Sequence, residues 1–271
     1  MTTPALSPLL HQFTAAAVRG GEIAMDWFRP GERTHARIDS KEGGSPVTEA
    51  DHAVDAFLRA ELPPFAPQAA WLSEETEDDP HRLDCEQVII VDPIDGTRAF
   101  LSGDPRWGVC IALIIRGRPV AGVIHMPALN QTFVAEEGSG AYRNGELIRA
   151  SERPNLAGAT LAGPLSLINR LSSDGLSTKI VPKIPSLAYR FARVADGSLD
   201  AGLSSTNACD WDIAASDIIL REAGGIVSDL EGQPPRYNRA NIRHPILVAG
   251  PARLQQNLAD ALKRALAQTG K

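Results

Sequence analysis

The chain has 271 residues, of which 43% are hydrophobic and 22% are charged, and its formal net charge is −6. This length allows a sizeable core, in one large domain or in two closely packed halves, which we place at residues 1–150 and 151–271. The negative charge and the absence of a basic run argue against a nucleic-acid polymer or a membrane surface as a partner.

The three cysteines, Cys85, Cys110 and Cys209, are scattered and do not have the spacing of metal ligands, so we expect free thiols in a reducing compartment. The first residues lack the pattern of a signal peptide, and no apolar run approaches the ~18 residues that a membrane span needs. We therefore expect a soluble cytoplasmic protein.

The first elements expected along the chain are helices. Residues 5–28 have apolar side chains at helical spacing, with a break expected at Gly20 and Gly21. A second helix follows residues 47–51, where Thr48 and Asp51 have the spacing of a capping box. Taken alone, the capping box gives Asp51 a purely structural role.

A short strand is expected at residues 69–73, before the acidic run 74–79. Such a run is usually a solvated loop. Glu74 and Glu75 directly follow the strand end, so only these two have a serious claim to be ligands.

Residues 88–91 are four consecutive β-branched residues, typical of a strand buried on both faces. Asp92 and Asp95 follow at its C-terminal end. Because Pro93 cannot extend the hydrogen-bond ladder and Gly96 permits a tight turn, we expect both carboxylates to converge on one point. Two such anions repel each other unless a cation lies between them. The motif therefore predicts a site for a hard divalent ion, with Mg²⁺ as the first candidate.

Residues 96–101, after this bend, are typical of the opening of a short helix, whose first N–H groups lack intrahelical partners and bind phosphate. A metal site and an anion-binding turn so close together indicate phosphate-ester chemistry. The alternative is an ordinary acidic loop between a strand and a helix.

The remaining runs predict an α+β protein in two parts. Strand-like runs and a hairpin with an Asn144-Gly145 turn predict helices packed on an antiparallel sheet in the first half: residues 107–115, 119–125, 131–136 and 138–145. In the second half, strands and helices alternate in the manner of a layered α/β region. The expected strands are 160–162, 179–181 and 246–248, and the expected helices are 165–171, 187–195, 212–223 and 252–267.

Residues 210–225 form the second cluster of chemically interesting side chains. They predict a helix that begins at a carboxylate and ends at Gly224 and Gly225. In isolation, Asp212 has the default role of a helix N-cap.

At this point the sequence resembles the inositol monophosphatase family of metal-dependent, lithium-sensitive phosphomonoesterases. The resemblance rests on an ordered series of motifs, at residues 46–51, 73–75, 92–97, 211–212 and 222–225. It covers most of the chain. It implies a layered αβαβα sandwich, often assembled as a homodimer.

The resemblance also implies a set of ligands for two Mg²⁺ ions: Glu74, Asp92, Asp95, Asp212 and the main-chain carbonyl of Ile94. Asp51 would serve a third, weaker ion, and Li⁺ would inhibit.

Three residues are implied to be catalytic, because Glu74 and Thr97 would orient the attacking water beside the ligand Asp95. The amides of Gly96 and Thr97 would hold the phosphate. A metal lowers the pKa of a bound water, and paired ions stabilise the attacking and leaving oxygens of an in-line displacement. No covalent enzyme intermediate is needed.

Two competing interpretations are weaker. Haloacid-dehalogenase-type phosphatases use Asp-x-Asp, whereas the spacing from Asp92 to Asp95 is Asp-x-x-Asp, and one extra residue redirects the second side chain. A non-catalytic metal-binding protein with the same fold predicts the loss of a ligand or of Thr97, and neither is lost.

The substrate is the least determined feature of the sequence. Inositol-specific members carry a glutamate where this chain has Ser205, and their Gly-Thr/Ser-Ala segment is represented here only by the hydroxyl of Ser186. Both departures weaken the case for inositol phosphate. Conversely, a basic residue at the positions of Lys41 and Arg98 makes the sequence resemble the bacterial 3'(2'),5'-bisphosphate nucleotidase branch. Lys41, Arg98 and Arg190 are the cations that could pair with a second phosphate of the substrate.

The alternative is that all three cations are ordinary surface residues that bind no phosphate. Histidinol phosphatases also carry a basic residue after the Gly-Thr pair, so Arg98 does not separate them from nucleotidases. We rank bisphosphate nucleotidase first, an inositol or other sugar monophosphatase second, and histidinol phosphatase third. The partner is in each case a small phosphorylated metabolite.

Overall fold

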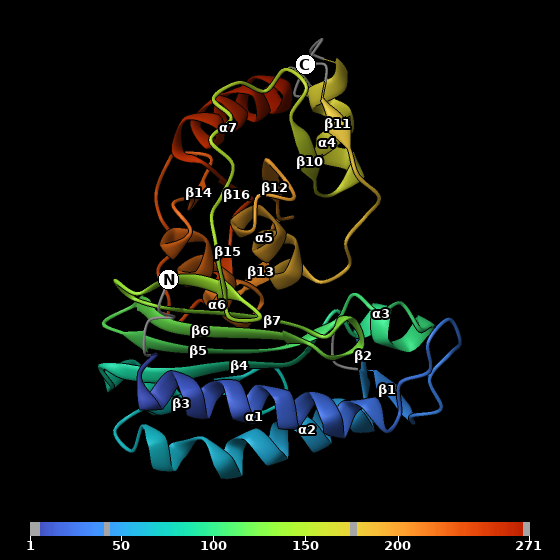
Figure 1. Ribbon diagram of the computed structural model, residues 1–271, viewed down its shortest axis with the longest axis vertical. Coiled ribbons are helices and arrows are strands. Elements are labelled where there is room, and N and C mark those ends of the chain that lie inside the picture. The colour runs from blue at the N-terminus through green and yellow to red at the C-terminus, as the bar shows by residue number, and fades with distance from the viewer. Residues whose placement is uncertain (1–5, 41–43, 174–177, 268–271) are drawn as a thin grey trace.

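The computed structural model describes residues 6–40, 44–173 and 178–267, and it stacks helices and sheets in five layers (Figure 1). From bottom to top in Figure 1 these are the helices α1 and α2, a seven-stranded sheet, the helices α5 and α6, a five-stranded sheet, and the helices α4 and α7. The arrangement confirms the predicted αβαβα sandwich.

The seven-stranded sheet has the strand order β3-β4-β5-β6-β7-β8-β9. Its strands are β3 (Ala70–Ser73), β4 (Gln87–Asp95), β5 (Gly108–Ile115), β6 (Arg118–Met126), β7 (Gln131–Glu136), β8 (Gly140–Arg143) and β9 (Glu146–Ile148). Neighbouring strands pair antiparallel from β4 to β9, as predicted, but β3 pairs parallel with β4. The sheet is therefore mixed at one edge. The polar segment 74–86 connects β3 to β4 and returns the chain to the same edge, so that both strands run in the same direction.

The middle of β4 is buried on both faces, which confirms the prediction from its β-branched run. Val88, Ile89, Ile90 and Val91 are each at most 1% exposed. Alternate residues belong to two different apolar clusters, because α1 and α2 cover one face of the sheet and α5 and α6 cover the other. A strand in this position offers polar side chains only where it ends.

Helix α1 (Pro8–Met25) packs beside α2 (Glu49–Glu61). The predicted break at Gly20 and Gly21 is wrong, since α1 is continuous through both residues. A Cβ atom on Gly21 would lie 2.6 Å from Cγ of Pro127 and 2.7 Å from Cδ2 of His125. The glycines therefore let the helix approach the sheet closely and do not interrupt it.

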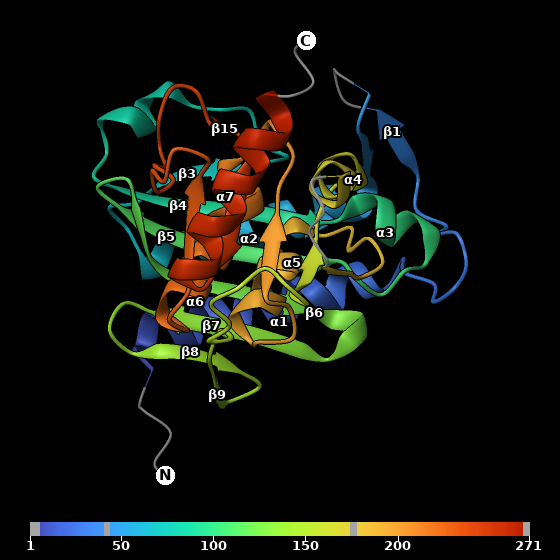
Figure 2. The same cartoon turned by 90° about the horizontal axis from the view of Figure 1, so that it is seen from above.

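The five-stranded sheet has the order β11-β10-β12-β16-β14. Its strands are β10 (Thr160–Ala162), β11 (Lys179–Ile180), β12 (Ala201–Leu203), β14 (Ile226–Asp229) and β16 (Leu247–Gly250). β10 pairs parallel with β11 and β12, and β16 pairs antiparallel with β12 and β14. Figure 2 shows α7 lying across this sheet.

The helices of the second half lie close to their predicted positions: α4 (Leu165–Ser173), α5 (Leu187–Ala195), α6 (Asp210–Glu222) and α7 (Ala252–Ala267). The remaining elements are short: β1 (Ile38–Ser40), β2 (Pro46–Thr48), β13 (Ala208–Cys209), β15 (Arg243–His244), α3 (Thr97–Ser102), and the 3-10 helices η1 (Pro63–Phe65), η2 (Pro80–Asp84) and η3 (Pro127–Leu129). No helix among the described residues is long and apolar enough to cross a membrane.

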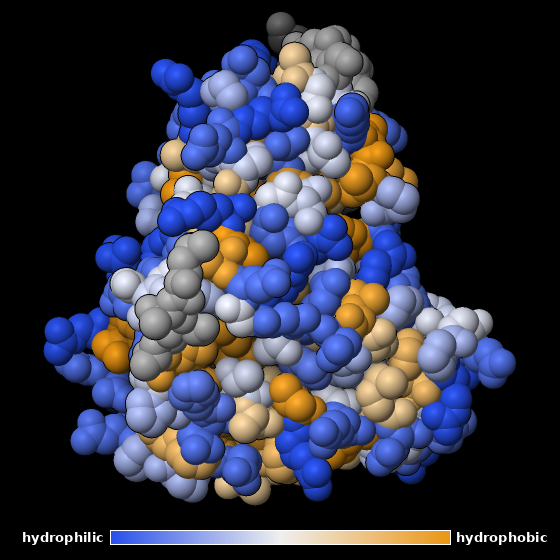
Figure 3. Space-filling view, in the orientation of Figure 1, coloured by the Kyte–Doolittle hydropathy of each residue, from blue (hydrophilic) through white to orange (hydrophobic). Residues whose placement is uncertain are grey.

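On the face of the molecule in Figure 3, apolar side chains gather in small groups between hydrophilic ones. The large apolar residues that are exposed include Phe65, Leu147 and Ile180, which belong to three different elements. Scattered exposure of this kind is normal for a folded protein.

Candidate active site

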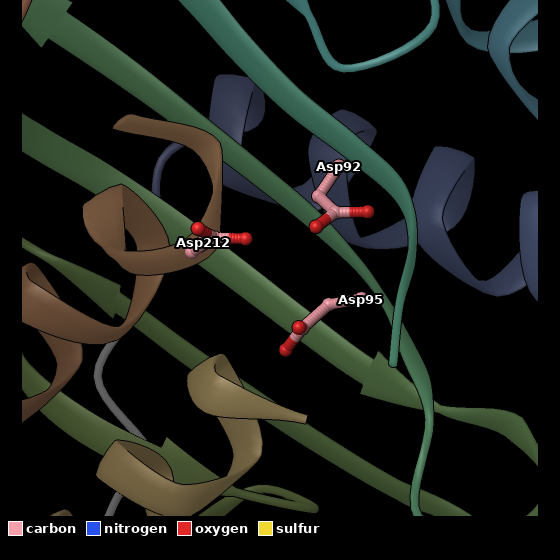
Figure 4. A group of neighbouring side chains, drawn as sticks. All are labelled: Asp92, Asp95 and Asp212. Carbon is pink, nitrogen blue, oxygen red and sulfur yellow. The ribbon is translucent and has the colours of Figure 1, made fainter. Parts of the chain in front are cut away.

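Three carboxylates meet where the end of β4 faces the start of α6 (Figure 4). Asp92 and Asp95 come from β4, and Asp212 comes from the first turn of α6. One oxygen of each lies within 4.8 Å of one oxygen of the others. The predicted convergence of Asp92 and Asp95 is therefore present, and Asp212 joins them from the other half of the chain.

An irregularity in the pairing of β4 with β5 explains why Asp92 and Asp95 point to the same side. Asp92 pairs with Cys110 and Asp95 pairs with Gly108, so β4 uses one more residue than β5 between these pairs. In a regular strand, two residues three positions apart face opposite sides of the sheet. The extra residue reverses this and brings both carboxylates to one face.

Asp212 is fixed by the start of its helix. Its carboxylate accepts a hydrogen bond of 2.6 Å from the backbone N–H of Cys209. The helix begins at Asp210, which is fully buried and accepts a hydrogen bond of 2.9 Å from the backbone N–H of Asn238. Nε2 of His244 lies 2.7 Å from the other oxygen of Asp210. Asp212 is thus not the N-cap expected from the sequence: Cys209 is the N-cap, and Asp212 is the third residue of α6, bonded back to Cys209 and facing Asp92 and Asp95.

Burial raises the pKa of all three carboxylic acids, and the charges of neighbouring carboxylates raise it further. The pKa of Asp92 lies well above its usual range, that of Asp95 rises to about 6, and that of Asp212 rises to about 8. Without a cation, the cluster would take up protons near neutral pH.

The cluster fits a hard divalent cation. Its donor atoms are all oxygens, they lie close enough to share one ion, and a positive charge between them removes the repulsion that raises their pKa values. Asp92, Asp95 and Asp212 are thus the residues that would hold a metal such as Mg²⁺.

Asp95 is oriented by the turn that leads into α5. Its carboxylate accepts hydrogen bonds from the hydroxyl of Ser186 and from the backbone N–H groups of Leu187 and Ala188. Ser186, which the sequence suggested as a substrate contact, is fully buried and also accepts a hydrogen bond from the N–H of Tyr189. Ser186 lines neither of the two pockets described below. The same serine caps α5 and fixes the carboxylate of Asp95.

The turn after Asp95 offers unpaired amides, as predicted. Among the described residues, the backbone N–H groups of Gly96, Thr97 and Arg98 donate no hydrogen bond, and all three residues line one pocket. Gly96 has a φ of +96°, and a Cβ atom there would lie 3.2 Å from the backbone oxygen of Arg106. The left-handed backbone and the close contact both favour glycine at this position.

Asp51 forms the predicted capping box, because its Oδ2 accepts hydrogen bonds from the N–H and the hydroxyl of Thr48. Its other oxygen lies 3.5 Å from the hydroxyl of Thr97, which also donates to the carbonyl of Ile94 at 3.2 Å. Asp51 is 1% exposed. The cap of α2 is thus in contact with the turn that follows β4.

Glu74 lies at the end of β3, and its backbone N–H donates to the carbonyl of Val91 at 3.3 Å. Its charge raises the pKa of Asp92, Asp95 and Asp212, whereas the charge of Glu75 acts on Asp92. Glu74 also lines the pocket beside Gly96 and Thr97. The geometry therefore favours Glu74 over Glu75 as the acidic residue nearest the cluster.

The strand end that carries Glu74 is held by a buried carboxylate on α2. Asp55 accepts a hydrogen bond from the hydroxyl of Ser73 and another of 2.7 Å from the hydroxyl of Thr76. These two hydroxyls flank Glu74 and Glu75 in the sequence.

Two adjoining pockets open over the cluster. One of about 510 Å³ is lined by Asp95 and Asp212, and the other of about 230 Å³ is lined by Glu74 and the turn at Gly96. Lys183 and Pro185 line both pockets. Together these pockets have a volume suited to a small metabolite.

The candidate substrate residues occupy different positions. Ser205 is exposed and lines the larger pocket, and Arg98 is exposed and lines the smaller one. Arg190 lines the larger pocket but is only 6% exposed, and its guanidinium donates to the carbonyls of Leu203 and Ile184 at 2.7 and 2.6 Å. Lys41 lies outside the described residues.

Lys183 was missed by the sequence analysis. It is exposed, and its carbonyl accepts a hydrogen bond of 2.9 Å from Nη1 of Arg106. The available signal was its place between Pro182 and Pro185, just before Ser186. Prolines stiffen a segment, so a cation between them is held near the pocket.

The sequence model of the inositol monophosphatase family matches residues 5–267 of the chain. The chain belongs to the inositol monophosphatase family. The family comprises metal-dependent phosphomonoesterases, so the protein is a metal-dependent phosphoric monoester hydrolase.

Relatives within the family carry different names. An inositol-1-monophosphatase of Mesorhizobium japonicum is 33% identical over 97% of this chain and 98% of its own. The 3'(2'),5'-bisphosphate nucleotidase CysQ of Aggregatibacter actinomycetemcomitans is 34% identical over 79% of this chain and 83% of its own. The Nus factor SuhB of Salmonella typhimurium is 30% identical over 94% of this chain and 100% of its own.

Among solved structures, the extragenic suppressor protein SuhB of Bartonella henselae superimposes with a TM-score of 0.83. It is 31% identical and covers 95% of this chain and 99% of its own. The family and the fold are thus established together, and the relatives do not agree on one substrate.

Proposed function

We propose that the protein hydrolyses a small phosphate ester that carries a second anionic group, with a 3'(2'),5'-bisphosphate nucleotide as the first candidate. The observation that supports this most is the pair of exposed cations that line the same pocket as the phosphate-binding turn. Arg98 lines the smaller pocket and Lys183 lines both pockets. A phosphate bound at the turn leaves these cations for a second phosphate.

Asp92, Asp95 and Asp212, with Glu74 and the carbonyl of Ile94, would hold two Mg²⁺ ions, and Asp51 would serve a third. Bound there, the metal supplies an acidified water and neutralises the charge that develops on the phosphate.

The protein groups divide the remaining work. The free amides of Gly96 and Thr97 bind the phosphate oxygens, and the side chains of Glu74 and Thr97 orient the attacking water. The bond from Ser186 keeps Asp95 in its orientation. No protein nucleophile takes part, so the phosphate passes directly to water.

An inositol or other sugar monophosphate is the second candidate. The relative from Mesorhizobium japonicum supports it, and the hydroxyl of Ser205 would face the sugar in the larger pocket. Histidinol phosphate is the third, since a basic residue at Arg98 suits it equally. We further propose a cytoplasmic homodimer that binds neither a nucleic-acid polymer nor a membrane and is inhibited by Li⁺.

The test measures phosphate release with Mg²⁺ from 3'-phosphoadenosine 5'-phosphate, inositol 1-phosphate and histidinol phosphate, with and without Li⁺. We expect the highest kcat/KM for the nucleotide. Lys183→Gln and Arg98→Gln should each lower that value about 10- to 100-fold, since each removes a charged hydrogen bond. The same substitutions should change inositol 1-phosphate turnover less than threefold.

Arg116→Gln is the matched control, because Arg116 is an exposed arginine paired with Glu86 and does not line either pocket. A preference for either monoester would overturn the nucleotidase proposal and leave the metal mechanism in place. No release from any of the three esters would contradict the proposed set of substrates.

A further inference from the structure

A pocket of about 310 Å³ lies at the end of α6 that is far from the active site. It is lined by the start of β6, the last turns of α6, the strand β14 and the loop that follows it, and Figure 1 shows these elements as neighbours. Arg221 in this pocket is nine residues beyond Asp212 on α6, which is about 13 Å along the helix axis. Among the described residues, this pocket shares no lining residue with the two active-site pockets.

Three arginines line this distal pocket: Arg118, Arg221 and Arg236. Arg221 is anchored, since its Nη2 donates to the carbonyl of Pro119 at 2.6 Å, and its distance to the exposed Glu137 is 3.9 Å. Arg118 and Arg236 are exposed. Within residues 6–40, 44–173 and 178–267, their guanidinium groups form no ion pair and donate no hydrogen bond. Two guanidinium groups are thus available to a ligand.

The distal pocket holds one carboxylate against these three cations. Asp217 is 7% exposed, and its Oδ2 accepts a hydrogen bond of 2.9 Å from the hydroxyl of Tyr237. The charges of Arg221 and Arg118 also act on this carboxylate, but one carboxylate does not balance three guanidinium groups. The lining of the pocket therefore keeps an excess of positive charge although the chain as a whole carries −6.

Apolar residues make up most of the remaining lining: Pro119, Ile226, Val227, Pro234 and Pro235. Ile226 is 37% exposed, so part of its aliphatic side chain is accessible to a ligand. Small-molecule sites combine such an apolar lining with a few polar groups that fix the orientation of the ligand.

We propose that the distal pocket binds a small organic anion in which a carboxylate or a phosphate is joined to an apolar body. The anionic group pairs with Arg118 and Arg236, for which guanidinium groups have matching geometry. The apolar body covers Ile226 and the prolines. This site is separate from the hydrolytic site and does not depend on which ester the protein hydrolyses.

The test uses phenylphosphonate and benzoate as probes, and inorganic phosphate as the probe without an apolar body. Binding is measured by titration calorimetry on protein that has been stripped of metal with EDTA and then dialysed free of EDTA, so that metal-dependent binding at the active site does not contribute. We expect one or both organic probes to bind the wild-type protein and to bind at least tenfold more weakly to the double variant R118Q/R236Q. Comparing the two probes identifies whether the site prefers phosphate or carboxylate.

Two further variants complete the experiment. R19Q/R253Q removes two exposed arginines outside the pocket and should leave the affinity unchanged. Asp212→Asn alters the active site and should also leave it unchanged. R118Q/R236Q should keep wild-type Mg²⁺-dependent turnover, which shows that it folds.

The absence of binding of both organic probes to the wild-type protein would overturn the proposal. So would equal affinity for wild-type and R118Q/R236Q protein, a loss of binding in Asp212→Asn, or inorganic phosphate binding as tightly as the organic probes.

Discussion

At the scale of single residues, the site depends on carboxylates that would be costly to bury together without a cation. Asp92, Asp95 and Asp212 all have raised pKa values because of burial and mutual repulsion. Glu74 adds to that repulsion at all three positions. When a divalent ion binds, it attracts each carboxylate, and this attraction outweighs their mutual repulsion. The acidic residues are therefore explained by function and not by stability.

Glu74 and Glu75 provide a matched pair for a residue-scale prediction. We expect Glu74→Gln to lower Mg²⁺-dependent turnover at least about 100-fold, because the carboxylate is lost next to the phosphate turn. Glu75→Gln should lower it less than about fivefold. Steady-state assays of both variants at saturating Mg²⁺ check this, and equal damage at the two positions would show that the choice of Glu74 is wrong.

His125 carries a prediction about pH. Burial lowers its pKa from 6.5 to about 4, so the folded protein keeps it neutral while the unfolded chain takes up a proton below pH 6.5. Its contribution to stability is therefore complete above pH 6.5 and is lost as the pH falls toward 4. The loss amounts to about 3 kcal/mol in the free energy of unfolding.

Urea unfolding of the wild-type protein and of His125→Gln at several pH values tests this. The difference between the two free energies should change by roughly that amount between pH 7 and pH 4, because the carboxylates titrate in both proteins. A difference that stays constant over this range would contradict the assigned shift.

At the scale of elements, close packing of α1 on the seven-stranded sheet accounts for a pair of glycines that the sequence suggested were a helix break. Gly21→Ala would place Cβ 2.6 Å from Pro127, so we expect a loss of about 1–3 kcal/mol of stability despite the better helix propensity of alanine. Gly20→Ala is the control, since its nearest contact, Cγ1 of Val54, is 3.2 Å away.

We expect Gly20→Ala to change the free energy of unfolding by less than about 1 kcal/mol, because the helix gains about as much as the contact costs. Chemical denaturation of the two variants makes the comparison. If Gly21→Ala were as stable as the wild-type protein, α1 would have to lie farther from the sheet than it does here.

Sequence periodicity could predict the long elements, and it predicted only some of the short strands. α5 and α7 have the predicted bounds, and the buried run in β4 is a strand as expected. β12 and β14 were not predicted although β10, which is as short, was, because strands of three or four residues contain too few alternations to be identified consistently. Likewise, no local pattern indicates that β3 runs parallel to β4.

The candidate site was predictable where the chemistry is concentrated in one motif. Asp92 and Asp95 follow a buried strand, so their position at its end could be inferred from the sequence. The position of Lys183 was harder to infer, since the flanking prolines do not indicate that this residue lines both pockets of the folded chain. Contacts of that kind depend on tertiary structure and leave little trace in local sequence.

At the scale of the whole molecule, the site joins the first half of the chain to the second. β4 supplies two of the carboxylates and α6 supplies the third, and the apolar cluster above the sheet contains residues from both halves. We propose that residues 1–150 and 151–271 form two halves whose contact is strengthened by the metal. A ligand that binds only the folded protein stabilises it.

Mg²⁺ at about 100 times its dissociation constant should therefore raise the free energy of unfolding by about 2.7 kcal/mol. Thermal and urea unfolding with Mg²⁺ and with EDTA measure this. In Asp212→Asn the increase at the same Mg²⁺ concentration should fall to less than half, because the ligand from the second half is lost. An undiminished increase in that variant would show that Mg²⁺ binds elsewhere.

The most direct test of the metal-dependent mechanism is Mg²⁺-dependent phosphate release by Asp95→Asn, compared with the wild-type protein and with Asp84→Asn, an exposed aspartate outside the site. We predict that Asp84→Asn keeps wild-type turnover. Asp95→Asn should fold normally and lose at least about 1,000-fold of its turnover at saturating Mg²⁺. Turnover by Asp95→Asn within a few-fold of wild type would contradict the assignment of this cluster as the catalytic metal site.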